Sequence, residues 1–191
     1  LSICENYPKP ALDVCMNFLS THDTERVITA LADELAAGRD RAWQAGRRLE
    51  GEAYRTGLRL SGLAHALLFF LPGNPCVYYG DEWGMQGYRD PFNRGCFEPE
   101  KGDAALKGWI ERLGGIRKAH PMLGKARFEK VAADNDTLLF LREGDGARLF
   151  VGVCRADRPF AAKLPVRKAL MGRYNGGLIH FEPPGIFIAE G

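Results

Sequence analysis

The sequence predicts an α/β segment followed by an all-β segment. Two short apolar runs, Met16–Leu19 and Cys76–Tyr79, each end in polar or ionisable residues, Ser20–Asp23 and Gly80–Glu82, and a helical pattern follows each one along the chain. This order predicts two consecutive βα units. After Pro121, short β-type runs alternate with turn residues, which is typical of antiparallel strands.

The N-terminal elements are less regular. Leu1–Tyr7 is expected to be the tail of a helix or a loop, and it is punctuated by Pro8 and Pro10. After the first strand we expect a helix over Thr24–Ala36, because apolar residues recur on one side of it: Val27, Ile28, Leu31 and Leu35. The basic stretch Gly38–Gly51 is expected to be a solvated surface segment, with sugar contacts as a minor alternative.

The clearest helix is predicted over Thr56–Leu71. From Leu60, apolar residues recur at i, i+3, i+4, i+7, i+8 and i+11, a wide stripe suited to covering a sheet. His65 lies off that stripe, so we expect it at the surface or only partly buried. Pro72–Pro75 ends the helix in a turn.

A long irregular segment follows the second strand. Residues Gly80–Gly102 are rich in Gly, Pro, aromatic and charged residues, and a loop of this length inside a compact domain is usually functional. Asp103 then fits the N-cap of a helix over Ala104–Ala119, which His120-Pro121 ends.

The remainder predicts a small antiparallel β domain. Its expected strands are Phe128–Ala132, Thr137–Arg142, Arg148–Cys154, Phe160–Leu164, Leu178–Phe181 and Gly185–Ala189. Asp134–Asp136 and Gly144–Gly146 lie between strands as hairpin turns. We therefore expect an α/β domain over residues 1–120 and a β domain over residues 121–191.

Composition excludes several classes of function. The 191 residues are 46% hydrophobic and carry a net charge of +2, so neither nucleic acid nor an acidic partner is indicated. No apolar run reaches the roughly 20 residues that a membrane span needs. The five cysteines are odd in number, far apart and without a C-x-x-C pair. We expect them to be reduced, which favours a cytoplasmic setting and gives no sign of a zinc site.

His22 and Asp23 are open to two interpretations. A carboxylate and an imidazole at the end of a buried strand can grip a hydroxylated ligand, and the carboxylate can stabilise a developing cation. Parallel α/β barrels keep their chemistry at that end of their strands. Alternatively, Asp23 or Thr24 only caps the following helix. The second polar strand end, some fifty residues on, favours chemistry.

Together these residues resemble the motifs of the α-amylase family of glycoside hydrolases. Phe18–Asp23 is similar to the seventh-strand motif of that family, and Gly73–Glu82 to its eighth strand and exit loop. Gly87–Arg94 resembles a loop of the neopullulanase and cyclomaltodextrinase branch. The resemblance implies the last two βα units of a TIM (β/α)8 barrel, followed by a small antiparallel β-sandwich.

The resemblance also implies roles for single residues. Asp23 matches the third carboxylate of the family, which stabilises the transition state of a retaining glycosidase, and His22 matches the imidazole that binds sugar hydroxyls. The nucleophile and the acid/base belong to the fourth and fifth strands, outside this chain, and Glu82 is expected to shape its loop. The chain departs from the family pattern at Thr21, where Asn is usual, and over Gly95–Pro99, which leaves the substrate preference open.

Asp90 and Arg94 are spaced four residues apart in the long loop. Paired, they can offer acceptors and donors to a glucose unit, and the resemblance implies substrate binding for both. A salt bridge that only orders the loop is the alternative. Trp83, Tyr88 and Phe92 fit either a sugar-stacking wall or loop packing.

The chain is expected to be a C-terminal piece of a longer enzyme. A complete (β/α)8 barrel needs about 250 residues, and only two barrel-like strands are found here. Its partners would be the missing N-terminal part of the barrel and an α-glucan or maltooligosaccharide substrate, and the piece alone should be inactive. Uncovered edges at Met16–Ser20 and Cys76–Tyr79 predict self-association or local remodelling.

Two other functions fit parts of the sequence. A non-catalytic carbohydrate-binding or scaffolding fragment predicts aromatic platforms on the β domain, where the candidates are Phe160, Tyr174 and Phe181. A metal-dependent hydrolase would have to combine His22 and Asp23 with a distant histidine. Nothing in the spacing draws these residues together, so neither a metal nor another cofactor is expected.

Overall fold

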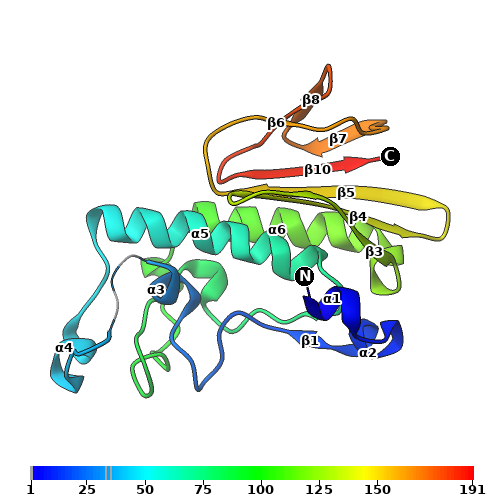
Figure 1. Ribbon diagram of the computed structural model, residues 1–191. Coiled ribbons are helices and arrows are strands. Elements are labelled where there is room, and N and C mark those ends of the chain that lie inside the picture. Colours follow the sequence, from blue (N-terminus) through cyan, green and yellow to red (C-terminus); the bar gives the residue numbers. More distant parts are fainter. Residues whose placement is uncertain (1, 33, 35) are drawn as a thin grey trace. The chain divides into compact units, whose positions relative to one another are not determined.

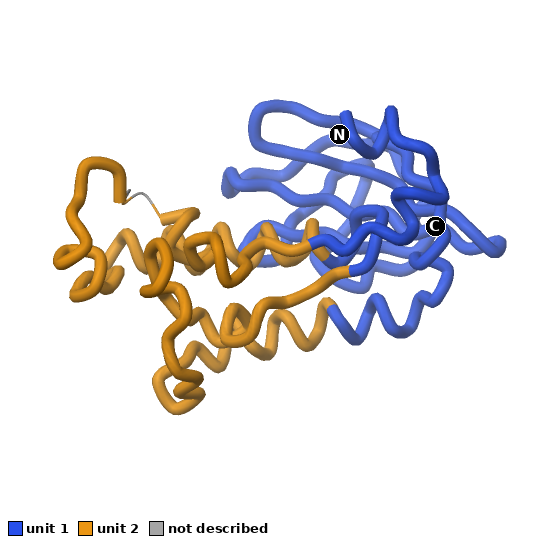
Figure 2. The backbone as a smooth tube through the Cα atoms, turned by 90° about the horizontal axis from the view of Figure 1, so that it is seen from below, with its two compact units in different colours: residues 1–17, 69–74, 114–191 blue, residues 18–68, 75–113 orange. Residues whose placement is uncertain are grey.

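The computed structural model (Figure 1) describes residues 2–32, 34 and 36–191. The chain divides into two compact units, coloured separately in Figure 2. Unit 1 comprises the residues up to Asn17, Phe69–Asn74 and Gly114–Gly191, and unit 2 comprises Phe18–Leu68 and Pro75–Leu113. The domain boundary at residue 120 stays a prediction.

Unit 1 contains two antiparallel sheets, whose strands lie side by side in Figure 1. The larger has the order β3-β4-β5-β10-β7, with β3 (Arg127–Ala133), β4 (Thr137–Gly144), β5 (Ala147–Cys154), β7 (Lys168–Met171) and β10 (Ile186–Glu190). The smaller has the order β6-β9-β8, with β6 (Phe160–Ala161), β8 (Arg173–Asn175) and β9 (Leu178–His180). The prediction of antiparallel strands after Pro121 is confirmed.

One apolar core serves both sheets. Leu139 and Phe187 of the larger sheet are fully buried, and Phe160 and Tyr174 of the smaller sheet pack against the same cluster. The turn between β4 and β5 is the predicted one: Asp145 and Gly146 have φ of 51° and 74°, as a two-residue hairpin loop with the right twist requires. β7 and β8 were not predicted, because they are short and lack an alternating apolar pattern.

The helices are spread over both units. Unit 1 contains α1 (Ser2–Asn6), α2 (Lys9–Val14) and the 3-10 turn η3 (Pro121–Gly124). Unit 2 contains α3 (Val27–Leu31), α4 (Arg41–Gly46) and the 3-10 turns η1 (Asp81–Trp83) and η2 (Pro99–Lys101). Two longer helices, α5 (Gly51–Phe70) and α6 (Ala104–Ala119), begin in unit 2 and end in unit 1.

The bounds of the two long helices agree better with the predicted bounds than those of α3 do. For α6, the Leu106 N–H donates to Asp103 Oδ1 at 2.8 Å, so Asp103 caps the helix as expected. The helix predicted over Thr24–Ala36 is shortened to Val27–Leu31, because the backbone is extended at Arg26 (ψ 140°) and at Ala32 (ψ 149°). Leu35, expected on its apolar side, lies outside the described residues.

His65 of α5 corrects a sequence-based expectation. It is fully buried rather than at the surface or partly buried. Its Nδ1 lies 2.8 Å from the Ser61 carbonyl one turn earlier, so the ring donates a hydrogen bond that makes burial tolerable. Burial lowers the pKa of His65, which keeps the ring neutral.

The two predicted barrel strands are the largest departure from expectation. Regular pairing is limited to β1 (Met16–Asn17) and β2 (Asn74–Pro75), which form a two-stranded sheet, and the run Cys76–Tyr79 is not a strand. Met16 and Phe18 were expected in a buried strand but are 63% and 50% exposed. Strands extend only where neighbours satisfy their backbone groups, so two isolated segments stay short. The barrel units therefore remain a proposal.

None of the helices formed by residues 2–32, 34 and 36–191 has both the length and the hydropathy to cross a bilayer.

Candidate active site

The loop that follows β1 presents His22 and Asp23 to solvent. Its turn is closed by short bonds: the Thr21 N–H donates to Thr24 Oγ1 at 2.8 Å, and the Asp23 N–H donates to Thr21 Oγ1 at 3.1 Å. The side chains of His22 and Asp23 are 67% and 71% exposed, with His22 Nε2 3.2 Å from Asp23 Oδ2. Both groups are therefore accessible to a ligand.

Asp23 does not cap a helix. The N-cap of α3 is Arg26, whose side chain makes no capping hydrogen bond. Thr24 uses its hydroxyl inside the loop instead. The capping interpretation of Asp23 and Thr24 is thus wrong, and the exposed carboxylate of Asp23 has no such structural task.

The second loop brings Asp90 and Arg94 to the same place within unit 2. Arg94 Nε lies 2.8 Å from Asp90 Oδ1, and Arg94 Nη2 lies 3.7 Å from Asp23 Oδ1. Arg94 Nε also donates to the His22 carbonyl at 3.0 Å. The four residues predicted from the sequence are therefore in contact, joined through one guanidinium.

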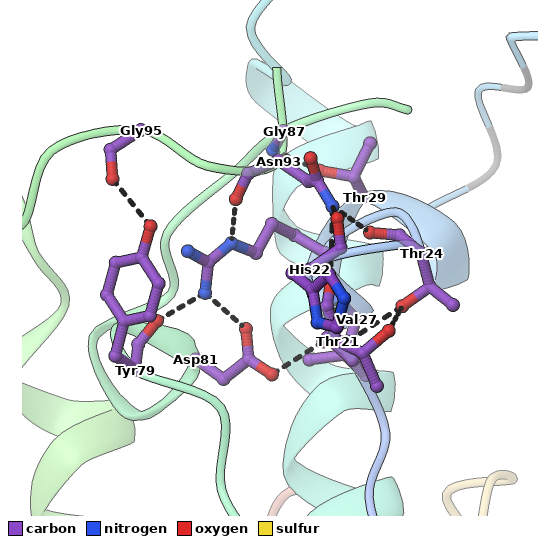
Figure 3. Close-up of polar contacts among 12 residues, drawn as sticks. Thr21, His22, Thr24, Val27, Thr29, Tyr79, Asp81, Gly87, Asn93 and Gly95 are labelled. Carbon is purple, nitrogen blue, oxygen red and sulfur yellow. Dashed lines mark hydrogen bonds and ion pairs between the residues drawn. The ribbon is translucent and has the colours of Figure 1, made fainter. Parts of the chain in front are cut away.

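Beneath these exposed groups lies a buried arginine, Arg26. Its Nε donates to the Asn93 carbonyl at 2.7 Å, and its Nη1 contacts both the Tyr79 carbonyl and Asp81 Oδ1, the latter at 3.1 Å. Its backbone N–H donates to the Gly87 carbonyl at 2.9 Å. Figure 3 shows Tyr79 and Asp81 in the lower part of the view, and Gly87 and Asn93 above them. Arg26 thus ties three loop segments together.

Asp81 links Arg26 to the first loop. It is 2% exposed, and Ser20 Oγ donates to Asp81 Oδ2 at 2.5 Å while accepting from the Val27 N–H at 2.9 Å. Burial raises the pKa of Asp81, against the opposing effects of the Ser20 and Arg26 hydrogen bonds. The carboxylate is stabilised by few partners, so the loss of Arg26 should strongly destabilise the folded state.

Asn93 is a further buried polar side chain at the site. Its Nδ2 donates to the carbonyls of Thr21, His22 and Thr24 at 3.2, 2.8 and 2.7 Å, contacts drawn in Figure 3. Sequence reasoning missed Arg26, Asp81 and Asn93 as parts of the site. The signal that could have found Asn93 was its place next to Arg94 in the motif loop.

The aromatic residues of the second loop do not form a common sugar-stacking wall. Tyr88 is 1% exposed, and its hydroxyl donates to Glu34 Oε1 at 2.8 Å. Gly102 lies so close to the ring of Trp83 that a Cβ there would be 2.7 Å from it. Trp83 instead lines a hollow of about 560 Å³ together with Phe92, Arg48 and Glu98. Loop packing accounts for Tyr88 and for one face of Trp83.

Across the described part of the chain, no group of three or more His, Cys, Asp or Glu side chains is placed to hold a metal ion.

The aromatic side chains proposed as platforms on the β domain are also occupied. Phe160, Tyr174 and Phe181 are partly buried and pack against the core of unit 1. The Tyr174 hydroxyl bonds to the backbone, accepting from the Leu164 N–H at 2.9 Å. This disfavours a non-catalytic carbohydrate-binding fragment that relies on those rings.

Comparison with known proteins finds relatives named amylopullulanase and cyclomaltodextrinase. No family model matches it. It is 32% identical over 142 residues to an amylopullulanase from Thermoanaerobacter thermohydrosulfuricus, covering 74% of this chain and 9% of that protein. It is 25% identical over 178 residues to a cyclomaltodextrinase from Geobacillus thermopakistaniensis, covering 91% of this chain and 26% of that protein. The chain thus spans at most about a quarter of either relative.

Solved structures give the same result. The cyclic α-maltosyl-(1→6)-maltose hydrolase of Arthrobacter globiformis, in complex with that cyclic sugar, matches with a TM-score of 0.75 and 25% identity, covering 100% of this chain and 38% of the other. The debranching enzyme of Nostoc punctiforme shares the fold with a TM-score of 0.75 and 21% identity, covering 100% and 36%. With the motif loops in contact as described, the chain belongs to the α-amylase family of glycoside hydrolases.

Proposed function

We propose that this chain is part of a retaining glycosidase that hydrolyses or transfers α-glucosidic bonds, with Asp23 acting in the transition state. The observation that carries the proposal is the contact of His22, Asp23, Asp90 and Arg94 on one exposed face of unit 2. The relatives are named amylopullulanase and cyclomaltodextrinase, and these names support an α-glucan as the substrate.

The chemistry assigns each group a task. A retaining glycosidase passes through an oxocarbenium-like transition state between two carboxylates about 5 Å apart. Asp23 would add a third negative charge that meets the positive charge as it develops, and His22 would bind hydroxyls of the sugar at the cleavage site. Asp90 and Arg94 would supply an acceptor and a fork of donors to a neighbouring glucose unit.

The remaining catalytic groups are proposed to lie outside these residues. By the family resemblance, the nucleophile and the acid/base belong to two earlier barrel strands, so the site would be completed by a further part of the enzyme. We propose that residues 1–120 contribute the last two βα units of that barrel and residues 121–191 a β-sandwich. The isolated chain should then show no turnover of maltooligosaccharides.

The test is Asp23→Asn in the complete enzyme. Losing one preorganised electrostatic group should lower kcat about a hundredfold or more, with a smaller effect on KM, because the charge matters mainly in the transition state. Asp90→Ala and Arg94→Ala should instead raise KM. Asp157→Asn, an exposed aspartate in unit 1, is the matched control. A normal kcat for Asp23→Asn on every α-glucan tried would remove Asp23 from the mechanism.

Two further proposals concern the setting of the protein. A cytoplasmic location is supported by five free cysteines and by similarity to an intracellular maltogenic amylase of Bacillus subtilis, at 28% identity. Self-association of the isolated chain is supported by exposed apolar side chains near its start, Ile3, Tyr7, Val14 and Met16. Light scattering across a concentration series should show a mass above that of the monomer.

A further inference from the structure

We infer that Asn93 is a positioning residue for the reaction: its amide holds the loop that carries His22 and Asp23 in the shape the chemistry needs. The inference rests on the proposed function for its catalytic consequence. It concerns a buried side chain that donates its hydrogen bonds to the backbone of that loop and is itself not exposed.

The first support is the number of bonds that one amide makes to one loop. Asn93 is fully buried, and its Nδ2 lies within 3.2 Å of the carbonyl oxygens of Thr21, His22 and Thr24. A side-chain amide has two N–H donors, so one proton is shared between two of these acceptors. The backbone before and after Asp23 is thereby anchored to one buried side chain, through the bonds from Asn93 to Thr21, His22 and Thr24 that Figure 3 draws.

The second support comes from the oxygen of the same side-chain amide, Asn93 Oδ1. In the described part of the chain, Asn93 Oδ1 is buried without a hydrogen-bond donor. A buried acceptor left unpaired is costly, so the amide is retained for its donors. Three carbonyl acceptors also fix its orientation, because an oxygen in the place of Nδ2 would face three other oxygens.

The third support is that Asn93 is itself held on both sides. Its backbone carbonyl accepts a hydrogen bond from Arg26 Nε at 2.7 Å. The next residue, Arg94, donates to the His22 carbonyl at 3.0 Å and pairs with Asp23 at 3.7 Å. The loop of Asp90 and Arg94 and the loop of His22 and Asp23 are therefore placed relative to each other through Asn93 and its neighbours.

Isosteric substitution tests this inference. Asn93→Asp keeps the size and shape of the side chain but puts oxygens against three carbonyls, whereas Asn93→Ala only deletes the donors. If Asn93 positions the loop through its N–H groups, kcat of the complete enzyme should fall about ten- to a hundredfold in Asn93→Ala and further in Asn93→Asp. If Asn93 merely filled space, the isosteric Asp variant should be the better of the two.

A pH profile sharpens the comparison. A carboxylate facing three carbonyls is disfavoured against its protonated form, and a protonated carboxyl regains one O–H donor. The ratio of kcat for Asn93→Asp to that for Asn93→Ala should therefore rise as the pH is lowered. Asn17→Asp is the matched control, because Asn17 also donates to a backbone carbonyl, that of Pro72 at 2.7 Å, but in unit 1.

Amide hydrogen exchange in the same enzyme separates this inference from the proposed function. The N–H groups of Thr21, Asp23 and Thr24 are bonded within the loop and should exchange faster in Asn93→Asp than in Asn17→Asp. Unchanged exchange, or an Asp variant with kcat equal to or above that of Asn93→Ala, overturns the inference. If Asp23→Asn keeps a normal kcat, the proposed function falls and exchange alone decides whether Asn93 holds the loop.

Discussion

Replacing Arg26 by Met should destabilise unit 2 strongly, and more at neutral than at acidic pH. Arg26 is fully buried and pairs with Asp81, itself 2% exposed, across 3.1 Å. Met fills much of the same volume without charge or donors. The substitution therefore deprives the carbonyls of Tyr79 and Asn93 of the Arg26 donors and leaves the Asp81 carboxylate only the hydrogen bond from Ser20 among the bonds described above.

The magnitude follows from what the buried carboxylate can do. Removing one partner of a buried ion pair typically costs about 3–5 kcal/mol. Asp81 can limit that cost by taking up a proton. For a carboxyl group with the ordinary pKa of 3.8, the free energy of protonation at pH 7 is about 4 kcal/mol. At pH 5 the same protonation costs less than about 2 kcal/mol.

The sign of the pH dependence is fixed by the direction of the pKa shift. Burial already raises the folded-state pKa of Asp81 above its unfolded value, and the loss of Arg26 raises it further. A group with a raised folded pKa loses stability as the pH rises from the unfolded towards the folded value. The difference in unfolding free energy between wild type and Arg26→Met should therefore shrink by about 2–3 kcal/mol from pH 7 to pH 5.

The assay is urea unfolding of the chain followed by tryptophan fluorescence. All three tryptophans, Trp43, Trp83 and Trp109, belong to unit 2, so the signal reports on the unit that contains Arg26. The double variant Arg26→Met/Asp81→Asn removes the titrating group and should abolish the extra pH dependence. A loss below about 1 kcal/mol at pH 7, well under the usual cost of breaking a buried pair, would refute the reasoning, as would a loss independent of pH.

Further predictions concern packing, buried donors and acid stability. Gly57→Ala in α5 should cost about 1–3 kcal/mol in the same fluorescence assay, because its Cβ would lie 2.4 Å from a backbone carbonyl of α3. The control Gly108→Ala, with open space around it in α6, should gain about 0.5–1 kcal/mol. Arg142→Met removes three hydrogen bonds to backbone carbonyls in unit 1 and should cost about 3 kcal/mol, measured by circular dichroism of the strands. Arg47 lowers the pKa of Glu34 to about 2, so this pair should stabilise the wild type above pH 4.5 and lose its effect towards pH 2. Acid titration of Glu34→Gln should lack that component, and an unchanged acid transition would contradict it.

The parts of the fold that were predictable depend on local signals. Asp103 predicts the start of α6, because an N-cap side chain bonds to a backbone N–H within the next three residues. Asp145 and Gly146 predict their hairpin turn, because the turn needs positive φ at both positions and few residue types adopt it. The strand at Met16 was overestimated, because an apolar run gives its own preference but not the neighbours that a strand requires.

The candidate site divides in the same way. His22, Asp23, Asp90 and Arg94 could be predicted because they lie in recognisable motifs and are exposed, as charged residues usually are. Asp81 lies in the second polar strand end, but its buried pairing with Arg26 could not be predicted, because a charged residue in a sequence is read as solvent-facing unless its partner is known. That partner is 55 positions away and is brought close only by the fold.

The need for such buried donors follows from the irregular backbone of the site. Carbonyl groups in helices and sheets are satisfied by neighbouring N–H groups, but those of Thr21–Thr24 and Tyr79 lie in loops, where buried acceptors still require partners. Arg and Asn side chains carry several N–H groups in fixed geometry and can therefore serve several carbonyls at once. An apolar side chain could fill the same space but could not orient the loops, since apolar contact is not directional. The exposed groups at the site thus depend on polar residues buried beneath them.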